Sequence, residues 1–196
     1  LRGKSCSASA TARCTADRSY GRTGLGEGRQ RRRSRSSSTI GGIQMAVQAG
    51  ALSVDHLEVM STEALKSLHG SDTIATLLPS CSYFLGIPYA PARQLIQEDT
   101  LVALATDYNP GSSPGGNMQL VCNMACAKMK MTPAEALNAA TLNGAAALNL
   151  SDRKGSIAIG KDADILITKE IPSLEYICYD FGTNHIQQTL LAGLPS

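Results

Sequence analysis

Two polar residues in this sequence come at or directly after the ends of apolar runs of the kind that form strands. Asp107 follows residues 101–106, which read LVALAT, and His56 ends the run 52–56. A carboxylate beside buried apolar surface costs free energy unless it is paired or binds a metal ion, and histidine exchanges protons near neutral pH. Both residues also admit structural roles, Asp107 as a cap or turn residue and His56 as an ordinary structural histidine.

A loop rich in glycine, serine and proline follows Asp107. Residues 109–116 read NPGSSPGG, and successive backbone amides in such a turn can form a concave site for a carboxylate. A simple flexible turn explains the same composition equally well. The loop is therefore a candidate ligand site next to Asp107.

The remaining histidines and cysteines favour structural roles. Cys122 and Cys126 are four residues apart on one helix face, which indicates core or near-core positions rather than a metal site without further ligands. His69 fits a helix C-terminus, and His185 fits a strand or loop position. None of the six cysteines forms a C-x-x-C pair, which favours a reducing compartment, the cytoplasm, over a disulfide or zinc scaffold.

Strands and helices alternate through the middle of the chain and would position these residues. Thr132, Pro133 and Glu135 give one helix a capping box with proline at its first position. The predicted elements are strands 52–56, 73–78 and 101–106, helices 42–50, 61–69, 117–130 and 132–148 with one more opening at Pro91, and glycine-punctuated strands near 155–159, 163–168 and 185–192.

Three β/α units of this kind form either half of a doubly wound domain or the last third of a (β/α)8 barrel. His56 and Asp107 both lie where an apolar strand gives way to a loop, at carboxyl ends of strands, where barrels carry their catalytic groups. The sequence has neither G-x-G-x-x-G after a strand nor a phosphate-binding G-K-[ST]. We therefore predict an α/β fold of the barrel type.

Charge divides the chain near residue 38. Residues 1–38 carry ten Lys and Arg against two acids (+8), and residues 39–196 carry eight against fourteen (−6). The first segment lacks helical or strand periodicity, so we expect it to be disordered or non-native sequence. Its run of arginines at 31–35 could contact nucleic acid, although no accompanying fold supports such a partner. No apolar run approaches the roughly 18 residues that cross a bilayer, so no membrane partner is expected.

Several motifs resemble the imidazolonepropionase family of the amidohydrolase superfamily. Residues 105–112 (ATDYNPGS) are similar to its A-T-D-[FY]-N-P-G-[ST] stretch, and residues 53–58 (SVDHLE) to its [SA]-x-D-H-L-E. Residues 88–93 (PYAPAR) and 131–137 (MTPAEAL) also match. Residues 155–165 (GSIAIGKDADI) resemble a motif that builds the small β-domain beside the barrel throughout the superfamily.

The resemblance implies a metal-dependent hydrolase that converts 4-imidazolone-5-propanoate, a small-molecule substrate, to N-formimidoyl-L-glutamate in histidine degradation. Asp107 would be a ligand of one zinc or iron ion and would accept a proton from its bound water. His56 would stabilise the developing oxyanion or shuttle a proton. Asn109, Gly111 and Ser112 would bind the substrate, and the full-length form would be a homodimer.

The resemblance also implies a division into residues 1–38, then 39–150 as the last three β/α units of the barrel, then 151–196 as part of the small β-domain. The family carries three further metal-binding histidines, but no histidine precedes His56 here. The chain is thus expected to lack the first five strands and to keep one ligand of four, and to be inactive alone. We further hypothesise that 1–38 is translated in the wrong frame, which the upstream DNA sequence would test.

Alternative functions remain open at this stage. Another cyclic-amide amidohydrolase or a deaminase would share the superfamily motif, and turnover of imidazolone propanoate would distinguish the two. A non-catalytic fragment with a basic nucleic-acid-binding arm would instead show salt-sensitive RNA retention that is lost when 1–38 is deleted.

Overall fold

A computed structural model describes residues 41–196 of the chain. The segment 1–38, with its predicted disorder and arginine run, lies outside the described residues. The helices and strands of residues 41–196 are α1 Gly42–Gln48, β1 Ser53–Asp55, α2 Thr62–Leu68, β2 Ile74–Leu77, α3 Pro79–Leu85, α4 Ala92–Gln97, β3 Val102–Leu104, α5 Met118–Met129, α6 Pro133–Ala140, α7 Leu142–Ala147, β4 Ile165–Thr168, α8 Tyr176–Tyr179, β5 Ile186–Leu191 and β6 Leu194–Pro195.

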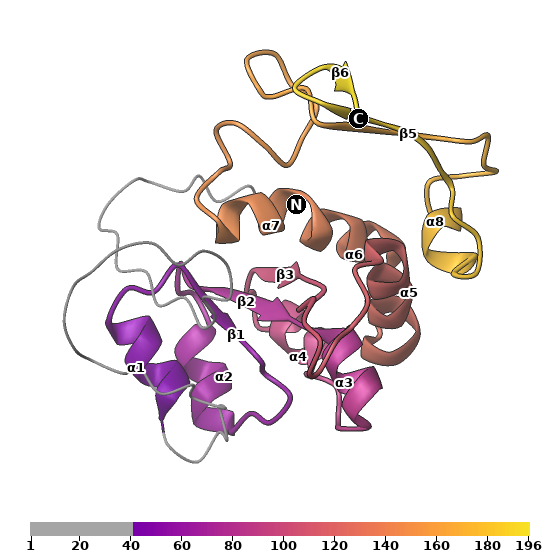
Figure 1. The fold of residues 1–196 in the computed structure, drawn as a ribbon. Coiled ribbons are helices and arrows are strands. Elements are labelled where there is room, and N and C mark those ends of the chain that lie inside the picture. Colours follow the sequence, from indigo (N-terminus) through magenta and orange to yellow (C-terminus); the bar gives the residue numbers. More distant parts are fainter. Residues whose placement is uncertain (1–40) are drawn as a thin grey trace, which may run out of the picture.

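A three-stranded parallel sheet organises the first two-thirds of the described chain. Its strand order is β1-β2-β3, and helices connect successive strands, as parallel pairing requires. In Figure 1 this sheet lies between α1 and α2 on one side and α5 to α7 on the other. The fold confirms the predicted β/α units and their order.

The core lies between the parallel sheet and its helices. All four residues of β2 are buried, because this strand is paired on both sides and covered by helices. The largest fully buried side chains are Leu57, Leu68, Ile74, Leu77, Leu95 and Val121.

The helix termini follow the local sequence signals. The Ser61 hydroxyl accepts a hydrogen bond from the amide of Ala64 at 3.1 Å, and His69 is the C-cap of the same helix, α2. Thr132 and Glu135 form the predicted capping box at the start of α6. Arg93, on α4, donates to both the Glu135 carboxylate and the Lys130 carbonyl, so this one side chain ties α4 to the end of α5 and the start of α6.

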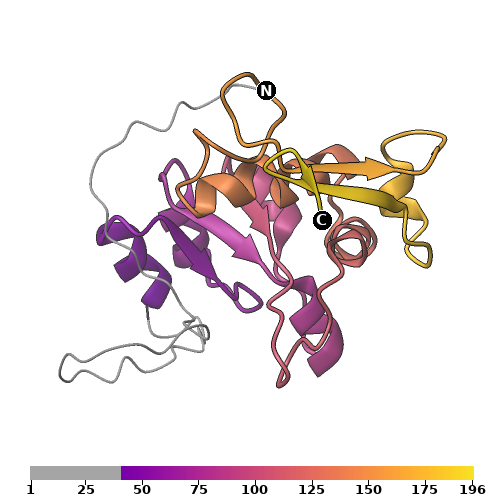
Figure 2. The ribbon, with the colours of Figure 1, turned by 45° about the horizontal axis from the view of Figure 1, so that its top comes forward.

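The last third of the chain forms a second, antiparallel sheet of order β4-β5-β6. Figure 2 shows this sheet, in orange and yellow, next to the helices of the β/α part, with α8 beside α5. The Asn123 side chain of α5 donates to the carbonyl of Cys178 in α8 at 2.7 Å, which fastens the two parts together.

Three details differ from the elements predicted from sequence. Residues 155–159 form no strand: Ile157 and Ile159 alternate correctly but are exposed, and no strand of the described residues pairs with them. The helix predicted over 132–148 is broken at Thr141 into α6 and α7, where the Thr141 hydroxyl donates back to the Leu137 carbonyl at 2.7 Å. The helix α3, which begins at Pro79 directly after β2, is not among the predicted elements.

Candidate functional site

The register of the parallel sheet brings the strand ends to one level. Asp55 of β1 pairs with Thr76 of β2, and Thr76 pairs with Ala103 of β3. The segments that leave the three strands therefore start at one edge of the sheet. This is the edge at which barrels place reacting groups, and His56 and Asp107 both lie there.

His56 lies directly after β1 in a left-handed backbone conformation, with φ of 60°. Its Nδ1 is 3.4 Å from Oε1 of Glu58, whose side chain is 10% exposed, whereas the histidine side chain is 37% exposed. The hydrogen bond with Glu58 raises the pKa of His56 above its ordinary value of 6.5; burial opposes the shift, and the charges of Glu58, Asp107 and Asp55 add to it. The hydrogen bond thus favours the protonated form of the imidazole.

Asp107 also has a left-handed conformation, with φ of 51°, three residues after the end of β3. One of its carboxylate oxygens, Oδ2, accepts a hydrogen bond from the Ser112 hydroxyl at 3.3 Å. Its negative charge also reaches His56, whose pKa it raises. The structure thus places the two predicted catalytic residues at one edge of the sheet, and Ser112 donates a hydrogen bond to one of them, Asp107.

The loop after Asp107 is held together by the side chain of Asn109. Its Oδ1 accepts from the amides of Gly111 at 2.9 Å and Ser112 at 2.8 Å, and its Nδ2 donates to the carbonyl of Asp107 at 2.6 Å and to the Ser112 hydroxyl at 2.9 Å. A bridge between Asn109 and Ser113 closes the turn. Because the backbone amides of Gly111 and Ser112 already donate to Asn109, a ligand of this loop would first contact the Ser112 hydroxyl and the Asp107 carboxylate.

Cys81 is a member of this site that sequence analysis did not single out. It lies on α3, the helix that leaves β2, and only 2% of the residue is exposed. Burial raises the pKa of its thiol, the Asp107 charge raises it further, and hydrogen bonding with Ser112 opposes both. The signal that could have found it is the same as for His56 and Asp107, since Cys81 also follows the carboxyl end of a parallel strand.

The residues of this edge do not by themselves fit a metal ion. Within residues 41–196, no three His, Cys, Asp or Glu side chains converge as metal ligands would. Asp107 is a suitable ligand for zinc or iron, but a catalytic zinc site needs about three protein ligands. The chemistry available to the described residues is therefore proton transfer and hydrogen bonding by His56 and Asp107, with Ser112 beside them.

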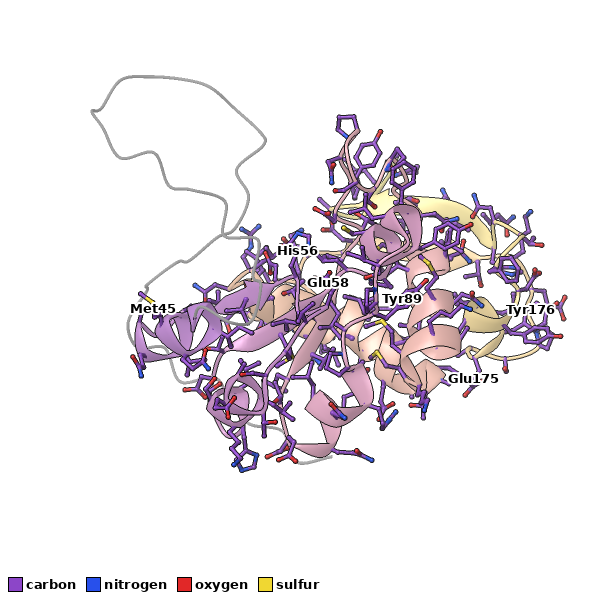
Figure 3. The ribbon with its side chains drawn as sticks, turned by 90° about the horizontal axis from the view of Figure 1, so that it is seen from below. Met45, His56, Glu58, Tyr89, Glu175 and Tyr176 are labelled. Atoms are coloured by element: carbon purple, nitrogen blue, oxygen red, sulfur yellow. The ribbon has the colours of Figure 1, made fainter. Side chains whose placement is uncertain are left out.

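The other histidines and cysteines of the described chain have structural surroundings. His69 bonds the carbonyl of Glu98 through Nδ1 at 2.7 Å, and His185, which is 5% exposed, lies 3.3 Å from Asp180 through Nε2. Cys122 is buried and Cys126 packs against the core, as predicted. In Figure 3 His56 and Glu58 lie well apart from Glu175 and Tyr176 of α8, where a separate open pocket is found.

The sequence matches the amidohydrolase family model over residues 26–194. The chain belongs to the amidohydrolase family. The matched range begins inside the basic segment 1–38 and covers both sheets of the structure. The fold is the expected α/β type, part of a barrel with an adjoining antiparallel sheet.

Two curated relatives of this amidohydrolase share one name. The chain is 55% identical over 156 residues to a protein named imidazolonepropionase from Christiangramia forsetii, and 46% identical over 150 residues to another protein of that name from Thermoanaerobacter pseudethanolicus. The matches cover 80% and 76% of this chain but only 38% and 36% of those proteins. The chain thus spans a little over a third of the length of the relatives it resembles.

A solved structure supports the fold of this amidohydrolase. An adenosine deaminase from Xanthomonas campestris with bound zinc superposes with a TM-score of 0.66 at 23% identity, over 73% of this chain and 36% of that one. Likeness at this level of identity shows the shared fold. Among residues 41–196, no helix is both long and apolar enough to cross a bilayer.

Proposed function

We propose that residues 41–196 are the carboxyl-terminal part of a hydrolase that opens the ring of 4-imidazolone-5-propanoate to give N-formimidoyl-L-glutamate. The observation that carries this proposal is the placement of His56 and Asp107 at one edge of the parallel sheet, in a chain that is 55% identical over 156 residues to an imidazolonepropionase. The substrate is a small molecule, in keeping with a site built from strand ends and a short loop.

The two residues have complementary roles in this proposal. His56, whose pKa is raised, would donate a hydrogen bond from its protonated ring to the oxyanion that develops on the ring carbonyl. Asp107 would accept a proton from the attacking water and would be one ligand of a zinc or iron ion. The remaining ligands would come from residues other than 41–196, in which no complete metal site exists.

The loop supports Asp107 and presents Ser112 to the substrate. Asn109 fixes the turn by bonding the amides of Gly111 and Ser112, so its contribution to binding is to hold the Ser112 hydroxyl next to the Asp107 carboxylate. We assign direct contact with the polar groups of the substrate to Ser112, and a supporting role to Asn109 and Gly111. Cytoplasmic location and a homodimer of the longer form remain predictions.

A chimeric protein, called the joined protein below, tests the proposal. Residues 41–196 replace the matching 156 residues of the Christiangramia forsetii protein, and the product is assayed with 4-imidazolone-5-propanoate and, separately, with adenosine. We expect N-formimidoyl-L-glutamate to form, no adenosine to be consumed, and turnover to fall at least a hundredfold in both Asp107→Asn and His56→Gln. A folded joined protein that deaminates adenosine, or that hydrolyses imidazolone propanoate equally well without Asp107, would contradict it.

A further inference from the structure

Three thiols gather where α5 meets α8, away from the candidate active site. Cys122 and Cys126 are one turn apart on α5, and Cys178 is on α8. Hydrogen bonding and charge interactions among the three thiols shift their pKa values, and all three are free. Three neighbouring thiols on two helices are not required by the proposed hydrolysis.

One of these thiols, that of Cys126, is partly exposed. Cys126 and Cys178 line a pocket of about 680 Å³ between the two helices, together with Asn123, Tyr176 and Tyr179. Cys122 is absent from the pocket lining, and Cys122 and Cys178 are each only 3% exposed. A small oxidant that enters this pocket therefore meets Cys126 first, with Cys178 as the other thiol of the pocket lining.

The position of α8 is already fixed by a neighbouring contact. Asn123, between the two cysteines of α5, donates to the backbone carbonyl of Cys178 at 2.7 Å. This bond holds the Cys178 backbone against α5, three residues before Cys126 in the same helix.

We propose that Cys126 and Cys178 are a redox modification site that forms a reversible disulfide between α5 and α8 when a low-molecular-weight disulfide enters the pocket. The Cys126 thiolate attacks the reagent and releases one thiol, which leaves a mixed disulfide on Cys126. The Cys178 thiolate then attacks the Cys126 sulfur and releases the second thiol. Two protein thiols are oxidised, the reagent is reduced to two thiols, and the two protons pass to those thiols.

The consequence is a covalent link between the two parts of the fold. Cys126 belongs to the β/α part and Cys178 to the segment between β4 and β5, so the disulfide fixes the antiparallel sheet against α5. Burial is the main cause of the raised pKa of Cys126, whereas hydrogen bonding with Cys122 and then burial raise the pKa of Cys178, so the exchange is slow near neutral pH without catalysis.

The test uses the full 196-residue chain with Cys6→Ser and Cys14→Ser, which leaves four thiols. The protein is incubated with glutathione disulfide, quenched, denatured and titrated for thiols, and then digested with trypsin. We expect the titre to fall from four to two, with the peptide 94–128 joined to the peptide 170–196. A reductant should restore four thiols.

Matched variants identify the partners. Cys122→Ser, which removes the buried neighbour, should still lose two thiols and form the same joined peptides. Cys126→Ser and, in case the hydroxyl disturbs packing, Cys126→Ala should lose none. Retention of all four thiols in the parent protein, or an unchanged yield of the joined peptides in the Cys126 variants, would overturn the proposal.

Discussion

His56 and Asp107 leave the ends of β1 and β3 in the same left-handed conformation, with φ of 60° and 51°. Such a conformation costs a non-glycine residue about 1 kcal/mol, although histidine and aspartate adopt it more readily than most residues. The two turns keep both side chains at one edge of the sheet, where the Asp107 charge acts on His56. The left-handed backbone at these two positions thus helps to place the imidazole of His56 and the carboxylate of Asp107.

The first prediction concerns the proton on His56. Because the hydrogen bond with Glu58 is the main cause of its raised pKa, Glu58→Gln should lower that pKa toward 6.5, and Asp107→Asn should lower it less. A pH titration of the His56 ring by NMR, assigned with His56→Gln, measures both shifts. A larger effect of Asp107→Asn than of Glu58→Gln would contradict this ranking.

The same raised pKa gives the sign of a stability effect. Since the folded-state pKa of His56 is above its unfolded value, its protonation stabilises the fold fully below about pH 6.5, and the contribution is lost as the pH rises through the folded-state pKa. The partly exposed ring makes the contribution small, so it is best measured as a difference in urea midpoint between the parent protein and His56→Gln at several pH values.

The second prediction concerns the ion pair between Arg93 and Glu135. Arg93 lowers the pKa of Glu135 to about 2, so Glu135→Gln should reduce the free energy of unfolding by about 1 kcal/mol at pH 6. A carboxyl group whose pKa is lowered in the folded state stabilises the fold at pH values above its unfolded-state pKa. The difference in unfolding free energy between the two proteins should therefore shrink as the pH falls from 4.5 toward 2. Urea unfolding of both proteins across this range checks it, and a difference that grows in acid would be inconsistent.

The third prediction separates the two halves of the Asn109 side chain. Asn109→Ala removes the acceptor of the Gly111 and Ser112 amides and should increase their hydrogen exchange at least tenfold. Asn109→Asp keeps an acceptor oxygen and loses the hydrogen bonds donated to the Asp107 carbonyl and the Ser112 hydroxyl, so both amides should stay protected. Equal exchange in the two variants would show that the side chain does not hold the turn.

The fourth prediction compares two glycines with nearly the same backbone. Gly155 and Gly160 have φ of 88° and 89°, but a Cβ on Gly155 would lie 2.7 Å from that of Ala145 and 2.9 Å from the Thr141 carbonyl, whereas Gly160 has open space. Gly160→Ala should cost about 1 kcal/mol from strain alone, and Gly155→Ala about 3 kcal/mol. If thermal unfolding showed equal losses of stability in the two variants, the segment after α7 would not pack as described.

Patterns that depend on neighbouring residues in sequence were the ones that sequence analysis predicted well. Ser61, Thr132 and Glu135 act within one helical turn, and the apolar run 101–106 is buried by any parallel sheet, so the β/α order and the strand ends followed. Residues 155–159 alternate as a strand does, but a strand also needs a partner, which alternation cannot supply.

Several contacts could not be predicted because they depend on the folded backbone and not on the spacing of residues in the sequence. The helix α3 exposes Tyr83 and Phe84, so it lacks the apolar stripe that would have revealed it, and the placement of Cys81 was lost with it. Similarly, nothing in the spacing of Cys122 and Cys126 indicated that Cys178, over fifty residues away, would meet them. Asn109 was placed in a loop, but its bonds to Gly111 and Ser112 follow only from the folded turn.

The metal content of the joined protein tests the central claim most directly, because Asp107 is proposed as the one ligand that residues 41–196 contribute. We predict about one zinc or iron ion per joined polypeptide, loss of most of that metal in Asp107→Asn with the fold retained, and no stoichiometric metal or turnover in the 196-residue chain alone. Full metal in the folded Asp107→Asn protein, or stoichiometric metal with hydrolysis in the chain alone, would contradict the account.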